Sequence, residues 1–69
     1  MRPMSLAAAR VDAKMTQDDV AKAMHVTKAT IVAWEKGKTQ PKIAQAQELC
    51  KLYDRGIDEI FLSVESSEN

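Results

Sequence analysis

The chain has 69 residues, no formal net charge and a single cysteine. A chain this short forms one small domain, and one cysteine cannot supply the disulfides that a secreted domain of this size usually needs. No apolar run has the length of a signal peptide or of a transmembrane helix. These features favour neither a secreted nor a membrane-embedded protein, and we expect a cytoplasmic one.

Helix-forming residues dominate the composition. Alanine, leucine, lysine, glutamine and glutamate are frequent, and only two glycines and two prolines interrupt them. The aromatic residues are Trp34, Tyr53 and Phe61. The composition therefore predicts an all-α domain over residues 1–62, followed by a polar tail over residues 63–69.

Charge is divided unevenly along the chain. Residues 1–42 contain eight lysines or arginines against four acids, a balance of +4, whereas residues 43–69 contain two against six, a balance of −4. The first part suits a polyanion and the second repels one. An ordinary solvated surface would carry the same charges, so charge alone does not decide between the two interpretations.

The first two helices are predicted before residue 25. Ser5 can cap a helix that runs from Ser5 to Ala13. Thr16 opens the second helix, because a threonine followed three residues later by an acid, Asp19, is typical of a capping box. Negative charge in this first turn also stabilises the helix, because it interacts favourably with the positive end of the helix dipole.

A break at His25 and Val26 separates the second helix from a third, predicted from Lys28 to Lys36. Thr27 caps this helix and Gly37 ends it. Ile31 and Trp34 share its inner side. The outer side carries Lys28, Ala29, Val32, Ala33 and Lys36.

The last two helices follow the loop that contains Pro41. Helical spacing predicts one from near Lys42 to Tyr53, with an apolar stripe along one side. The stripe consists of Ile43, Ala46, Leu49, Cys50 and Tyr53. After a turn at residues 54–56, a short helix is predicted from Ile57 to Leu62.

Two short helices joined by too few residues for a flexible linker form the helix-turn-helix pattern, whose second helix enters the major groove of DNA. The segment from Thr16 to Lys38 resembles the Cro/C1 type, also called the XRE family. The matching residues are Thr16, Gln17, Ala21, Val26, Thr27, Thr30, Ile31, Trp34, Glu35, Gly37 and Pro41. The resemblance covers about residues 5–62 and implies a compact lambda-repressor-like fold of five helices.

Three positions depart from the pattern of the XRE family. His25 and Lys14 stand where glycine is common, and Arg55 stands where an aliphatic residue is usual. A left-handed backbone costs histidine more than glycine. We therefore expect these departures to affect local stability more than the fold.

The outer face of the third helix contains the residues that we expect to meet the bases. Lys28 lies in the first turn and can donate to guanine O6 and N7. Ala29, Val32 and Ala33 have no hydrogen-bonding groups and suit the methyl group of thymine. The alternative is that this face is only solvated, although an exposed Val-Ala pair then has little purpose.

Four further residues are candidates for contacts with DNA phosphates: Gln17, Thr27, Lys36 and Lys38. Gln17 begins the second helix, where free backbone N–H groups favour an anion. The hydroxyl of Thr27 has a competing role as a cap, and the two lysines are also compatible with plain surface charge.

The resemblance implies a structural ion pair between Arg10 and Glu35. Trp34 could stack on a base, but its spacing with Ile31 favours the core. His25 has no second ligand at metal-binding spacing, so no metal is expected. No cofactor or small-molecule ligand is expected either.

The resemblance implies a sequence-specific regulator of transcription that binds double-stranded DNA, as a repressor of bacterial or phage origin associated with the nucleoid. A pseudo-palindromic operator and a homodimer are implied. The C-terminal region, with apolar Phe61, Leu62 and Val64, is the expected contact between subunits. The alternative is an antitoxin or anti-repressor that binds another protein through the same fold. An enzyme is not expected, since the sequence has no catalytic triad, metal cluster or phosphate loop.

Overall fold

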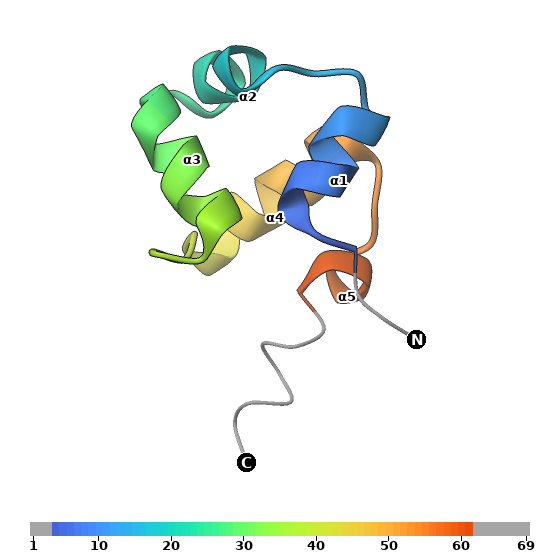
Figure 1. The fold of residues 1–69 in the computed structure, drawn as a ribbon. Coiled ribbons are helices and arrows are strands. Elements are labelled where there is room, and N and C mark those ends of the chain that lie inside the picture. Colours follow the sequence, from blue (N-terminus) through green and yellow to red (C-terminus); the bar gives the residue numbers. More distant parts are fainter. Residues whose placement is uncertain (1–3, 62–69) are drawn as a thin grey trace.

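A computed structural model describes residues 4–61, which form five helices and no strand (Figure 1). The helices are α1 (Leu6–Asp12), α2 (Gln17–Met24), α3 (Lys28–Lys36), α4 (Ile43–Tyr53) and α5 (Ile57–Ile60). The predicted all-α fold of five helices is therefore confirmed. The helix predicted to end at Leu62 ends at Ile60, and the tail predicted over residues 63–69 lies outside the described residues.

Hydroxyl groups begin each of the first three helices, as the sequence predicts. The side chains of Ser5, Thr16 and Thr27 accept hydrogen bonds from backbone N–H groups three residues later. In α2 the capping box is complete, because Asp19 Oδ2 accepts from the N–H of Thr16 at 2.8 Å. This backbone hydrogen bond lowers the pKa of Asp19, so the carboxylate stays charged beside the positive end of the helix dipole.

Left-handed residues turn the chain after four helical segments. Gly37 has φ +78, but the other three are Lys14, His25 and Asp54, with φ of 61, 60 and 56. Lys14 and His25, the two departures from glycine noted in the sequence, are thus strained positions. Each lowers the free energy of unfolding by about 1 kcal/mol relative to an unstrained residue. Neither prevents the turn.

The core lies where α1, α2, α3 and α4 meet. Val20, Ile31 and Leu49 are its largest fully buried side chains, and Trp34 and Tyr53 are buried beside them. Trp34 therefore belongs to the core and not to an exposed surface. The core also buries Cys50, and this burial raises the pKa of its thiol.

One member of the apolar stripe predicted along α4 is not buried. Ile43 lies on the apolar stripe of α4, yet the residue is 76% exposed. It stands in the first turn of α4, and the helix that could cover it, α5, is only four residues long. Ile43 instead lines an open apolar groove between α4, α5 and the start of α1.

Candidate nucleic-acid interface

The turn between α2 and α3 consists of His25, Val26 and Thr27. His25 adopts the left-handed conformation that ends α2, and the N–H of Val26 then donates to the carbonyl of Ala21 at 3.0 Å. Ala21 is 5% exposed, so the helices meet over a small side chain. This turn holds α3 across α2 at the edge of the molecule (Figure 1).

The fold directs the two sides of α3 in opposite directions. Ile31 and Trp34 are 1% and 7% exposed and face the core. The other side of the helix forms a shallow hollow of about 440 Å³ on the surface. Its lining residues are Lys28, Ala29, Val32, Ala33, Lys36 and Lys38. The structure thus brings together six of the eight residues that the sequence nominates for DNA contacts.

The other two nominated residues have partners within the protein. Thr27 Oγ1 accepts from the N–H of Thr30 at 3.2 Å and lies 3.0 Å from the Thr30 hydroxyl. Gln17 Nε2 donates to Glu35 Oε1 at 3.0 Å. This bond uses one of the two N–H donors of the Gln17 amide, so the second donor and the backbone N–H groups at the start of α2 remain suited to a phosphate.

Arg10 and Glu35 form an ion pair beneath the helix-turn-helix. Arg10 Nε lies 2.7 Å from Glu35 Oε2, and the two side chains are 16% and 8% exposed. Arg10 Nη1 also donates to the carbonyl of Met15 at 3.0 Å. The pair therefore connects α1 and the loop after it to the end of α3.

Most of the acidic side chains in residues 1–42 also have hydrogen-bond or ion-pair partners within the protein. Glu35 is held by Arg10, Asp19 closes the cap of α2, and Asp12 pairs with Arg55. No acid lines the hollow on α3. The positive charge of its three lysines is therefore not offset locally, although the whole chain is neutral.

Sequence reasoning missed two of these contacts. Asp12 and Arg55 lie 43 residues apart, and no periodicity links them. Arg55, noted as a departure from an aliphatic residue, thus joins the turn after α4 to the end of α1. The bond from Gln17 to Glu35 was also missed, because the family pattern suggested a different role for Gln17.

A family model described as Helix-turn-helix (HTH_3) matches residues 6–60. The chain belongs to this family. The resemblance to the Cro/C1 type is confirmed, and with it a DNA-binding helix-turn-helix in place of an enzyme. No solved structure matches the chain.

Curated relatives carry the same description. An uncharacterized HTH-type transcriptional regulator of Methanocaldococcus jannaschii is 40% identical over 48 residues, which is 70% of this chain and 73% of the relative. One from Archaeoglobus fulgidus is 36% identical over 53 residues, 77% of this chain and 75% of the relative. These relatives are archaeal, so they give no support to the bacterial or phage origin that the resemblance implied.

Within residues 4–61, no three or more His, Cys, Asp or Glu side chains are grouped so that they could hold a metal ion. The same part of the chain contains no helix that is long and apolar enough to cross a membrane.

Proposed function

We propose that this protein is a sequence-specific repressor that binds double-stranded DNA, with α3 in the major groove. One observation carries the proposal: Lys28, Ala29, Val32, Ala33, Lys36 and Lys38 line one hollow on the outer side of α3. The second helix of a helix-turn-helix reads base edges with its N-terminal part. Lys28 occupies that part and donates to guanine, while Lys36 and Lys38 near the other end neutralise phosphates.

The start of α2 supplies a further phosphate contact in this proposal. The N–H of Asp19 already bonds to Thr16 Oγ1, so the preceding amides, of Gln17 and Asp18, are the ones directed at the DNA backbone. The hydroxyl of Thr27, at the start of α3, caps that helix, so in this proposal it contacts a phosphate while it also accepts the capping hydrogen bond. These contacts position α3 and carry no sequence information.

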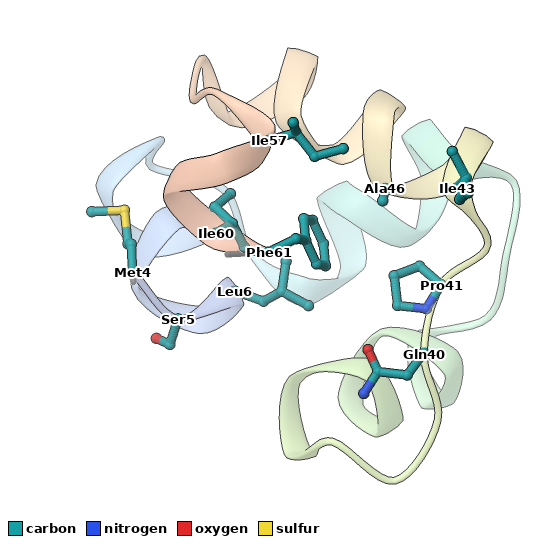
Figure 2. A pocket seen from close by; sticks show the side chains of 10 residues that line it. All are labelled: Met4, Ser5, Leu6, Gln40, Pro41, Ile43, Ala46, Ile57, Ile60 and Phe61. Carbon is teal, nitrogen blue, oxygen red and sulfur yellow. The ribbon is translucent and has the colours of Figure 1, made fainter. Parts of the chain in front are cut away.

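A homodimer is the second part of the proposal. An apolar groove of about 540 Å³ lies beside α5, and Figure 2 shows Leu6, Pro41 and Phe61 directed toward its centre. Ile43 and Ile57 at its rim are 76% and 45% exposed. Exposed apolar side chains around one groove are typical of an interface. The predicted contacts of Leu62 and Val64 lie outside the described residues.

Selection of bound sequences from a random duplex library tests the DNA proposal. We expect one enriched pseudo-palindrome with half-sites about 34 Å apart, one helical turn. Recovery of random sequence only would contradict sequence-specific binding. A single enriched half-site would contradict the dimer and leave the reading of DNA by α3 intact.

Analytical ultracentrifugation tests the dimer directly. Ile43→Glu places a charge in the groove and should give a monomer. Val11→Glu is a matched control, because Val11 is 62% exposed and does not line the groove. Equal sedimentation of both variants and the unchanged protein as monomers would contradict the dimer. It would favour the alternative function, in which a different protein occupies this groove.

A further inference from the structure

The hollow on α3 has an unusual chemical bias. Ala29, Val32 and Ala33 present only methyl groups, and the remaining lining residues are lysines. A lysine donates hydrogen bonds and accepts none. The lining side chains therefore offer donors and apolar contact, and they have no acceptor for the amino groups of adenine and cytosine.

The bases differ in how well they suit such a surface. Guanine presents two acceptors in the major groove, and thymine presents the acceptor O4 next to its C5-methyl group. Cytosine presents an amino donor and no methyl group. Thymine therefore matches both properties of the hollow, since its methyl group meets apolar carbon and its O4 meets a lysine.

Along α3 the lysines lie on either side of the three apolar residues. Lys28 lies in the first turn, whereas Val32 and Ala33 follow one turn later and are half-buried, which limits how far they can move. Alanine and valine side chains also lose little conformational entropy on contact. The methyl-lined part of the hollow is thus preorganised, and the lysine donors beside it are flexible.

We propose that Ala29, Val32 and Ala33 form a receptor for the C5-methyl group of a pyrimidine, so that this protein distinguishes thymine from cytosine mainly by that methyl group. This inference rests on the proposed binding of α3 in the major groove. It also assigns a second ligand: 5-methylcytosine carries the same methyl group and binds better than cytosine at the same position.

Four duplexes test the receptor, each with a different pyrimidine at one thymine position of the selected operator. Thymine and uracil both pair with adenine and differ only in the methyl group. 5-Methylcytosine and cytosine both pair with guanine and differ in the same way. Each half-site should contain one position where the methyl group matters. When that position is changed in one half-site, we expect thymine to bind about fourfold more tightly than uracil, and 5-methylcytosine about fourfold more tightly than cytosine. A factor of about four corresponds to the burial of one methyl group.

Val32→Ala identifies the receptor. Alanine favours a helix, so α3 should remain folded, and the buried Trp34 allows folding to be checked by fluorescence. The variant loses the two γ-methyl groups of Val32 but keeps a methyl group at that position, so it should lower both methyl ratios toward one. Val11→Ala is the matched control, since Val11 is exposed on α1 and outside the hollow, and it should leave both ratios unchanged.

Two results would overturn the receptor without affecting the proposed function. Equal binding of thymine and uracil at every position of a selected operator would show that no methyl group is read. Ratios that Val32→Ala leaves unchanged would place the methyl contact elsewhere. Failure to bind any duplex would instead contradict the proposed function itself.

Discussion

Arg10 and Glu35 lie 25 residues apart in the chain and form a mostly buried ion pair, with Nε and Oε2 separated by 2.7 Å. Gln17 adds a hydrogen bond to the same carboxylate at 3.0 Å. Three helices thereby converge on one charged group. The position of α3, which carries the hollow, depends on this group as well as on the apolar core.

Breaking this pair from one side should be costly. Arg10→Met leaves the Glu35 carboxylate without its charged partner, and we expect a loss of about 3–5 kcal/mol in the free energy of unfolding. Urea denaturation followed by the fluorescence of Trp34, the only tryptophan, measures it. The double variant Arg10→Met with Glu35→Leu is the control and should lose less. If the single variant loses no more than the double variant, the pair is unimportant for stability.

His25→Gly should stabilise the protein. His25 has φ 60 and ψ 41, a conformation that glycine adopts without strain. We expect a gain of about 0.5–1 kcal/mol, measured by the same denaturation experiment. Gly37→Ala is the opposite change at a similar position, with φ +78 and nothing within 4 Å of the added Cβ atom. It should destabilise by a similar amount through backbone strain alone, and a neutral result for both would contradict the role of the left-handed turns.

Lys28, in the first turn of α3, and Lys38, just beyond its end, should differ in what they contribute to DNA binding. Lys28→Ala should cost about 1–3 kcal/mol on the selected operator and weaken the preference for guanine. Lys38→Ala should weaken binding to all duplexes alike and reduce the slope of log affinity against log salt by about 1. Fluorescence anisotropy at several salt concentrations separates the two effects. Equal losses for Lys28→Ala on operator and random DNA would make Lys28 a phosphate contact.

Tyr53 should limit stability at alkaline pH. Burial raises the pKa of Tyr53 to about 12, with the charge of Glu35 adding to the rise and Arg10 opposing it. The unfolded tyrosine loses its proton near about pH 10, so the stabilisation is complete below that pH and is lost as pH rises toward the folded pKa. The Tyr53→Phe variant should therefore lose less stability than the unchanged protein as the pH rises from the unfolded pKa toward the folded pKa.

The titration of Tyr53 can also be observed directly. It is the only tyrosine, so the absorbance of tyrosinate reports this side chain alone. The folded protein should titrate near the raised value, and the protein in urea near the ordinary one. Identical midpoints in the two states would contradict the burial of the hydroxyl group.

Local patterns explain why so much of the fold was predictable. The hydroxyl caps at Thr16 and Thr27, the helical spacing of Ile31 and Trp34, and the turn at His25 all depend on residues within a few positions of each other. Such contacts leave a direct signature in the sequence. The outer face of α3 was predicted for the same reason, since the residues opposite a buried stripe must face outward.

Contacts between distant segments were not predictable in this way. The exposure of Ile43 depends on how short α5 is, and the pairing of Asp12 with Arg55 depends on the approach of α1 to the end of α4. Helical periodicity specifies which side of a helix is apolar, but it does not specify how far the neighbouring element extends.

The sequence by itself determined the five helices, the helix-turn-helix and the residues on the outer side of α3, because these follow from spacing and capping within each segment. Only the tertiary structure decided that Lys38 joins that face in one hollow, that most acids of the basic half have partners elsewhere, and that Gln17 donates to Glu35. These outcomes depend on distances between segments, which are set when the helices pack around Val20, Ile31 and Leu49.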